Sequence, residues 1–297
     1  MSKLSSEVPA DEVQIQRPSG KRLYSMSGGY IRRNLTIRDV IELKGQRVLT
    51  QVLVNSEEEA EAAEAAGIDM INIRWQQDAP ERSKSIRAAA GGTLTTFCMP
   101  LTKYVTEAEA LRAAFDAMEA GADGIYCCWT MRFIEAVAEA GIPVQGHAGL
   151  VPRKSTWVGG LRAIGKTVDE AIGIYRYMRD LENAGAWAVE SELIPQQVMA
   201  ELTKRTSLVT ISLGSGSGGD VQYLFGPDIL GDGPPPFPRH VKLYRRFYEL
   251  RQQMQTERIS AFREFAADVH SGAFPSDDLV VNVDDELLEH FIAEIDK

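Results

Sequence analysis

Four similar phrases recur along this sequence and constrain its fold more than any other feature. AEAAGID, MEAGADG, AEAGIPV and ENAGAWA each join the end of an amphipathic helical segment, a glycine and the start of an apolar run. Glycine is favoured just past the end of a helix because it adopts a left-handed backbone conformation without steric cost. Short apolar runs that alternate with such helices are typical of βαβ units and a parallel sheet. The regular spacing of the joints favours a (β/α)8 barrel over an open doubly wound sheet.

The segments between these joints can be assigned in order. Strands are expected over residues 47–54, 70–74, 93–98, 124–128, 143–146, 187–191 and 208–213. Helices are expected over residues 56–66, 106–119, 131–140, 168–184 and 195–205, with Ser56 as an N-cap and a capping box that opens at Thr106. The eighth unit is the weakest, because GSGSGGD and GPPPFP are typical of loops and connectors. Further helices are expected over residues 244–255, 260–269 and 284–295.

The composition divides the chain into three parts. Residues 1–33 are polar and rich in Pro, Gly and Ser, which predicts a flexible arm or a strap over a neighbouring subunit. Residues 34–256 carry the barrel pattern, and residues 257–297 form a helical extension at the C-terminus.

Length and charge limit the classes of function. A chain of 297 residues suits one barrel with short extensions, and a hydrophobic content of 44% can fill its core. The net charge of -10 argues against a nucleic-acid partner, while small anionic substrates stay open because one or two arginines bind them. No apolar run approaches the roughly 20 residues of a membrane span, and the N-terminus has no apolar stretch of a signal peptide. We therefore expect a cytoplasmic protein with a small-molecule substrate and no membrane partner.

In a (β/α)8 barrel the reactive groups lie at the C-terminal ends of the strands. These positions, together with the loop after residue 147, give the candidate site residues: Arg74, Trp75, Cys98, Tyr126, Cys128, His147, Arg153, Glu190 and Glu192.

Three motifs at these strand ends resemble the ketopantoate hydroxymethyltransferase family, a barrel of the phosphoenolpyruvate/pyruvate-binding type. Residues 146–167 (GHAGLVPRKSTWVGGLRAIGKT) are similar to its Gly-His-x-Gly-Leu-x-Pro-Gln segment with the Gly-Gly and Gly-Lys pairs that follow. Residues 184–195 (AGAWAVESELIP) are similar to its AGA and LE-x-x-P strand, and residues 211–222 (ISLGSGSGGDVQ) to its I-G-I-G-A-G loop. The opening helix, NLTIRDVIELKGQ, also resembles that of the family, so the likeness runs from about residue 34 to about residue 250.

The resemblance implies an aldol-type transfer. Enzymes of the family bind 3-methyl-2-oxobutanoate on Mg2+, and a glutamate, here Glu192, removes the C3 proton. The enolate then attacks a one-carbon unit from methylenetetrahydrofolate. The cation stabilises the enolate oxygen. The family also forms large homo-oligomers, which makes a homo-oligomer the expected state of this chain.

The chain departs from the family at the positions that hold the metal. Trp75 and Cys98 stand where the family has aspartates, and Cys128 stands where it has a glutamate. Tyr126 stands at a lysine position. Mg2+ requires oxygen ligands in octahedral geometry, which a tryptophan and two cysteines do not supply. We therefore predict that the usual Mg2+ site is lost and assign no metal ligand.

Each candidate also has a plainer interpretation. Glu192 is either the general base or a strand-end carboxylate in an ion pair, and Glu190 points the same way from a regular strand as a catalytic or structural partner. His147 either has a functional role, in which it contacts a substrate oxygen or orients Glu192, or is a structural histidine. Arg74 and Arg153 either bind a substrate carboxylate or are solvated loop arginines.

The cysteines and aromatic residues leave further alternatives open. Cys98 and Cys128 could line a reshaped pocket, form a reactive pair, or bind zinc with His147, while Cys127 faces the opposite side of its strand. Trp75, Tyr126, Trp129 and Trp157 suggest a larger, more aromatic pocket. The GSGSGGD loop is either structural or a phosphate cradle.

Three hypotheses of function follow. The first is a hydroxymethyltransferase-like enzyme that forms or cleaves a carbon–carbon bond of an α-keto acid through an enolate, diverged in substrate and metal use. The second is a metal-independent lyase, isomerase or hydrolase of specialised metabolism on the same barrel. The third is a non-catalytic binding protein. The retained Glu192 and His147 favour the enzymes.

Overall fold

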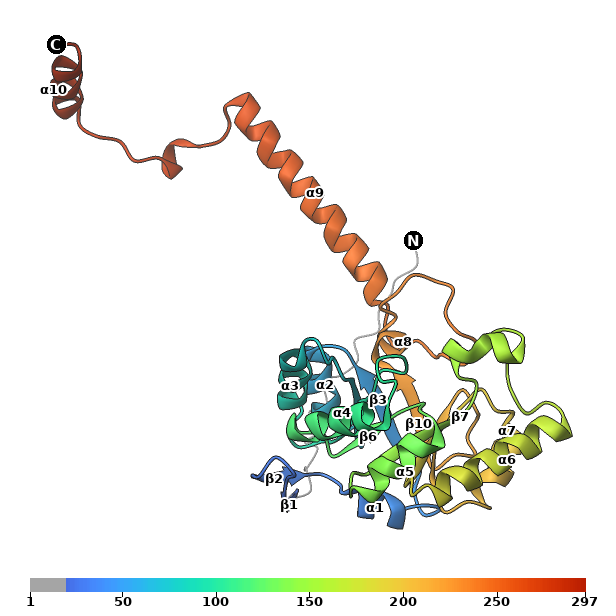
Figure 1. The fold of residues 1–297 in the computed structure, drawn as a ribbon. Coiled ribbons are helices and arrows are strands. Elements are labelled where there is room, and N and C mark those ends of the chain that lie inside the picture. The colour runs from blue at the N-terminus through green and yellow to red at the C-terminus, as the bar shows by residue number, and fades with distance from the viewer. Residues whose placement is uncertain (1–19) are drawn as a thin grey trace. The chain divides into compact units, whose positions relative to one another are not determined.

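Eight parallel strands close into a barrel in this structure, a computed structural model that describes residues 20–297 (Figure 1). The strands are β3 (Leu49–Val54), β4 (Met70–Arg74), β5 (Leu94–Cys98), β6 (Gly124–Tyr126), β7 (Val144–Gly149), β8 (Ala188–Glu192), β9 (Val209–Leu213) and β10 (Val221–Phe225). They pair in chain order, and β10 closes the ring against β3. The predicted (β/α)8 fold is confirmed.

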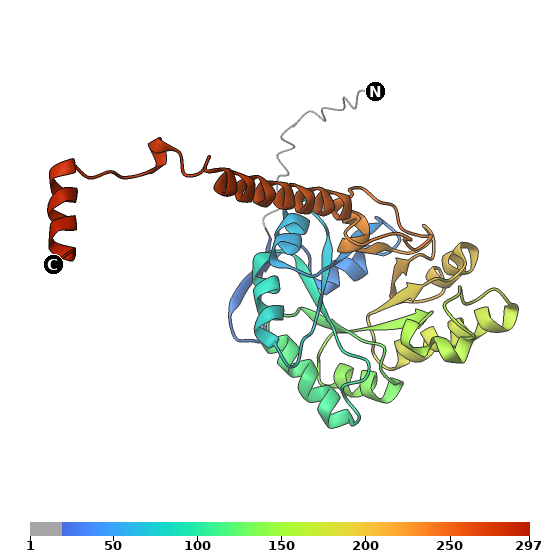
Figure 2. The same ribbon diagram turned by 90° about the horizontal axis from the view of Figure 1, so that it is seen from above.

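Helices cover the outside of the barrel between successive strands (Figure 2). They are α2 (Glu57–Ala65), α3 (Pro80–Ala89), α4 (Glu107–Glu119), α5 (Met131–Glu139), α6 (Val168–Asn183), α7 (Gln196–Thr203) and, after β10, α8 (Gly226–Leu230). The side chains of Ser56, Thr106 and Thr167 accept backbone N–H groups at the starts of α2, α4 and α6, and Thr106 forms the expected capping box with Glu109. Residues 214–220 connect β9 to β10 without a helix.

The barrel core has two layers because successive residues of a strand face opposite sides. One apolar cluster fills the interior and includes Leu49, Leu53, Met70, Leu94, Ala188, Val209, Ile211 and Val221. The other lies between the strands and the helices and includes Val52, Ile71, Ile73, Phe97, Ile125, Val144 and Val189. This division fixes which side chain at each strand end faces the interior.

Part of the predicted N-terminal arm forms an antiparallel hairpin of β1 (Lys21–Tyr24) and β2 (Tyr30–Arg33), followed by α1 (Ile37–Glu42). Arg33 anchors the hairpin, since its guanidinium bonds both carboxylate oxygens of Asp123 at 2.8 and 2.9 Å and the carbonyl of Gly91 at 2.7 Å. The prediction for residues 1–19 lies outside the described residues.

The chain divides into two units, of which the barrel unit extends to Leu230 and includes Pro235–Tyr244. The second unit contains α9 (Phe247–Ser271), a 3-10 turn (Asp277–Leu279) and α10 (Asp285–Ile295). One 25-residue helix thus replaces the two helices expected over 244–269, because nothing between them breaks the helix. Within residues 20–297, no helix is long and apolar enough to span a bilayer.

Candidate active site

His147, Glu190 and Glu192 come together at the C-terminal ends of β7 and β8. The strand register pairs His147 with Glu190 and Gly149 with Glu192, so both carboxylates face the interior two residues apart. Glu190 Oε1 lies 3.6 Å from His147 Nδ1, and Glu192 Oε2 lies 3.6 Å from His147 Nε2. His147 and Glu190 are buried, whereas the Glu192 side chain retains 13% exposure. The imidazole therefore lies between one buried carboxylate and one that reaches the mouth of the barrel.

Both nitrogens of His147 are in short hydrogen bonds. Nε2 lies 2.6 Å from the carbonyl oxygen of Leu150, and Nδ1 lies 2.6 Å from the hydroxyl of Tyr126 on β6. A carbonyl oxygen only accepts, so Nε2 carries a hydrogen in every protonation state. This contact fixes the tautomer of the neutral ring.

The Gly-His-x-Gly-Leu motif explains how Leu150 returns to His147. Gly149 has a φ of 84°, which L side chains rarely adopt, and a Cβ there would collide with the carbonyl of Glu192. The turn at Gly149 also lets the Leu150 N–H donate to the Glu192 carbonyl at 2.9 Å. The glycine thus couples the ends of β7 and β8.

Burial and charge shift the pKa of each member of this group. Burial lowers the pKa of His147, but its neighbours Cys128, Glu190 and Glu192 outweigh that effect and raise it to about 10. Burial raises the pKa of Glu192 to about 7, with His147 opposing and Glu190 adding to the rise. Burial also raises the pKa of Glu190. Near neutral pH, His147 is an imidazolium and Glu192 can accept a proton.

Arg74 ends β4 with its side chain on the interior side and exposed at the mouth. Its charge opposes the rise that burial causes in the pKa of Cys98, Glu190 and Tyr223, so the guanidinium lies within electrostatic range of these three groups. Arg74 has no ion-pair partner in the part of the chain that the structure describes. It is therefore free to meet an anionic ligand.

Cys98 and Cys128 lie at the ends of the adjacent strands β5 and β6. Cys128 Sγ lies 3.7 Å from the Tyr126 hydroxyl, and burial raises the pKa of Cys98, which disfavours a reactive thiolate there. Cys127 packs in the outer layer, as alternation along the strand predicts. Among residues 20–297, the one group of three potential ligands close enough for a metal is His147, Glu190 and Glu192, without either cysteine.

The predicted aromatic pocket is wrong for three of its four residues, because only Tyr126 reaches the group around His147. Trp75 is buried in the outer layer, where it stacks on Phe97 at 5.7 Å between ring centroids and donates to Gln77 at 2.7 Å. Trp129 donates to the Pro100 carbonyl, and Trp157 is 89% exposed.

Arg153 is also not part of the group. It is exposed on the 3-10 turn Pro152–Val158 that follows β7.

The residues at the family's metal positions do not fit Mg2+. Trp75 points away from the interior, and Cys98 and Cys128 offer thiols where Mg2+ requires oxygens. The group of His147, Glu190 and Glu192 is not a ready substitute, because the carboxylates flank different ring nitrogens and both nitrogens already hold hydrogen bonds.

A layer of buried polar side chains lies beneath His147, Glu190 and Glu192, and it was not predicted from the sequence. Asn72 Oδ1 accepts from Gln51 at 2.8 Å and from Thr96. In the described chain, Asn72 Nδ2, both side-chain polar atoms of Gln145 and Glu190 Oε2 are buried without a hydrogen-bond partner. Buried polar atoms are normally satisfied, so this layer has capacity for ordered water. The signal was a polar residue at alternate positions of otherwise apolar strands.

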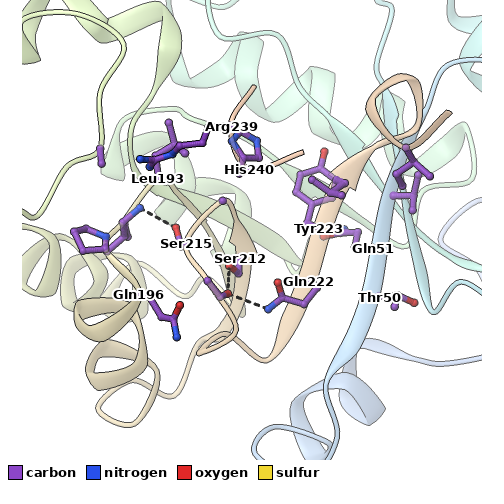
Figure 3. Close-up of a pocket in the computed structure, with 18 of the residues that line it drawn as sticks. Thr50, Gln51, Leu193, Gln196, Ser212, Ser215, Gln222, Tyr223, Arg239 and His240 are labelled. Atoms are coloured by element: carbon purple, nitrogen blue, oxygen red, sulfur yellow. Dashed lines mark hydrogen bonds between the residues drawn. The ribbon is translucent and has the colours of Figure 1, made fainter. Parts of the chain in front are cut away.

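The barrel unit also contains a cleft of about 890 Å3 (Figure 3). Its lining combines outward-facing strand residues such as Thr50, Ser212 and Gln222 with Gln51 and Tyr223 of the barrel interior and with residues of α7 and α8. It includes none of His147, Glu190 and Glu192. Ser215 ties the glycine-rich loop beside it to β8, accepting from the Ile194 N–H at 2.8 Å and donating to the Ser191 carbonyl at 2.7 Å. These bonds give the loop a structural role, and the phosphate cradle stays a prediction.

Comparison with known proteins gives a consistent result. A family model described as ketopantoate hydroxymethyltransferase matches residues 77–277. The 3-methyl-2-oxobutanoate hydroxymethyltransferase of Kosmotoga olearia is 30% identical over 261 residues, which cover 81% of this chain and 95% of that protein. A protein of the same name from Thermus thermophilus is 30% identical over 263 residues, which cover 82% of this chain and 98% of that one.

A solved structure agrees on the architecture. The carboxyl transferase domain of Rhizobium etli pyruvate carboxylase, with oxamate and biotin, matches with a TM-score of 0.51 at 12% identity. The match covers 72% of this chain and 48% of that chain. At this identity the likeness concerns the barrel alone.

Proposed function

The chain belongs to the ketopantoate hydroxymethyltransferase family, and from this premise we propose that it makes or breaks a carbon–carbon bond of an α-keto acid through an enolate. One observation carries the proposal. Glu192, a carboxylate whose pKa burial raises to about 7, stands at the mouth of the barrel beside His147. A general base is most effective when its pKa lies near the working pH.

Arg74 is the group that binds the substrate carboxylate in this proposal. A guanidinium presents a planar fork of donors that matches a carboxylate, and Arg74 has no competing ion pair among residues 20–297. With the carboxylate held there, the C3 proton of the keto acid can face Glu192. The base takes this proton, and the electrons of the C–H bond form the enolate.

The proposal also includes a donor for the one-carbon unit. The family resemblance implies methylenetetrahydrofolate. The residues at positions 75, 98 and 128 support divergence in metal use, and the thiols of Cys98 and Cys128 also change the substrate space. A metal-independent lyase or isomerase that uses the same enolate is the second candidate, favoured by the poor fit of these residues to Mg2+.

Hydrogen exchange tests the shared first step. The C3–H signal of 3-methyl-2-oxobutanoate is followed by proton NMR in D2O with Mg2+, without added metal, and with EDTA. We expect the protein to accelerate loss of the signal in all three conditions. We expect Glu192→Gln to abolish that acceleration and Glu201→Gln, which changes an exposed carboxylate of α7, to leave it unchanged. Absence of exchange under every condition would refute the proposal.

A further inference from the structure

We propose that the hydroxyl of Tyr126 donates the hydrogen bond that stabilises the keto and enolate oxygen of the substrate, in place of a metal ion. The inference rests on the proposed enolate chemistry and adds a catalytic residue to it. It concerns a position where the family resemblance implies a lysine.

Tyr126 is held at the centre of the candidate site. It ends β6, where its backbone pairs with Cys98 of β5 and Gln145 of β7. Its ring stacks against that of His147 with 6.1 Å between centroids, and its hydroxyl lies 2.6 Å from Nδ1. The phenol therefore has a fixed position between the mouth and the buried imidazole.

The protonation state of His147 decides whether the Tyr126 hydroxyl can donate a hydrogen bond to a substrate. Nε2 always donates to Leu150, so only Nδ1 can change between acceptor and donor. When the ring is neutral, the Tyr126 hydrogen is used in the bond to Nδ1. When the ring is charged, Nδ1 donates to the phenol oxygen, and the phenol O–H is released for another acceptor.

The two carboxylates beside His147 favour the charged form. Glu190 lies 3.6 Å from Nδ1 and Glu192 lies 3.6 Å from Nε2, one on each side of the ring. Such flanking anions stabilise an imidazolium. The site therefore keeps Tyr126 in the state with a free donor, and His147 is a positioning residue that acts through it.

Competition for the released O–H comes from two neighbours. Cys128 Sγ lies at 3.7 Å and is a weak acceptor. Glu190 is close enough for the Tyr126 hydroxyl to lower its pKa. A substrate oxygen that carries developing negative charge is a stronger acceptor than the thiol, and it competes with the carboxylate.

The step balances without a further reactant. The C3–H bond breaks and its proton goes to Glu192, while its electron pair forms the C2–C3 double bond. The electrons of the carbonyl π bond move to the oxygen. Tyr126 donates a hydrogen bond to this oxygen and keeps its proton, since burial raises the pKa of its phenol well above the usual range.

Tyr126→Phe tests the inference because it removes the donor and retains the ring. We expect the rate of C3–H exchange to fall roughly 100- to 1000-fold, as for loss of one oxyanion donor. Tyr104→Phe is the matched control, since its hydroxyl bonds Gln77 at 3.2 Å outside the barrel interior. Exchange by Tyr126→Phe within threefold of the wild-type rate would overturn the inference while leaving the proposed function intact.

Oxalate binding gives a second readout that does not require turnover. Oxalate is a planar dianion that resembles the enolate of an α-keto acid, and calorimetry measures its affinity. We expect Tyr126→Phe to weaken oxalate binding at least tenfold and Tyr104→Phe to leave it unchanged, with circular dichroism confirming the fold of both. Equal oxalate affinity in wild type and Tyr126→Phe would overturn the inference, whether or not the wild type catalyses exchange. Absence of exchange by the wild type contradicts the proposed function instead.

Discussion

Replacing Glu190 with glutamine should lower the pKa of His147. The substitution removes the carboxylate charge that lies 3.6 Å from Nδ1 and nearly preserves the shape of the side chain. At that distance and an effective dielectric constant of about 20, a full carboxylate charge attracts the imidazolium by about 4 to 5 kcal/mol. This energy corresponds to roughly a thousandfold in the protonation equilibrium, as an upper limit. The shift is smaller to the extent that Glu190, whose own pKa burial raises, already holds a proton.

Glu192 remains beside Nε2, so we expect the pKa of His147 to fall from about 10 toward that of an ordinary histidine rather than below it. Nitrogen-15 NMR of the ring across pH 5 to 11 measures the shift directly. The C3–H exchange rate gives a second measure. We expect this rate to decline at alkaline pH, because His147 loses its proton and Tyr126 no longer has a free O–H. In Glu190→Gln the decline should occur at lower pH than in the wild type. Glu201→Gln should leave both curves in place, and an unchanged titration of His147 in Glu190→Gln would refute the electrostatic reasoning.

Three further predictions follow from the same geometry. Glu192→Gln should raise the free energy of unfolding at pH 8 by about 2 to 3 kcal/mol, measured in urea. The pKa of Glu192 is raised from 4.5 to about 7 in the fold, so its contribution to stability is present at low pH and is lost as the pH rises through about 7, a loss that glutamine does not suffer. Gly149→Ala should cost at least about 1 to 2 kcal/mol of stability, because the left-handed backbone and the collision with the Glu192 carbonyl act together; a urea midpoint equal to that of the wild type would contradict this. Arg74→Gln should raise the KM for the keto acid roughly 10- to 100-fold with a smaller change in kcat, whereas an effect on kcat alone would show that Arg74 does not hold the substrate carboxylate.

The barrel could be predicted because its signals are local. Helix ends with glycine, caps such as Ser56 and Thr106, and short apolar runs each depend on a few neighbouring residues. The helix α3 was missed because it has no side-chain N-cap and no strong apolar stripe. The hairpin at residues 21–33 was missed because its anchor, the pairing of Arg33 with Asp123, joins residues 90 positions apart.

The site was only partly predictable because parallel strands are buried on both faces. Their hydropathy does not show which residue faces the interior. In β4, Met70 and Asn72 face inward, so Arg74 does as well, and Trp75 turns to the helices. Likeness to a motif placed Trp75 in the site, whereas the pleat of the strand places Arg74 there. The hydrogen bonds of His147 depend on the turn at Gly149 and had no signal in the sequence beyond the motif itself.

The changes at the metal positions form a consistent electrostatic set. A divalent cation is retained by carboxylate ligands, and the matching positions here carry the indole of Trp75 and the thiols of Cys98 and Cys128. The charge that balances the buried carboxylate of Glu190 and the carboxylate of Glu192 at the mouth instead resides on His147, and Arg74 adds a second cation from the protein itself. A cation that is part of the chain cannot be removed by a chelator, but its charge is lost when it gives up its proton. On this reasoning, enolisation by the protein should be insensitive to EDTA and should fail at high pH as His147 deprotonates. Inhibition by EDTA that Mg2+ reverses would show instead that a metal supplies the missing charge.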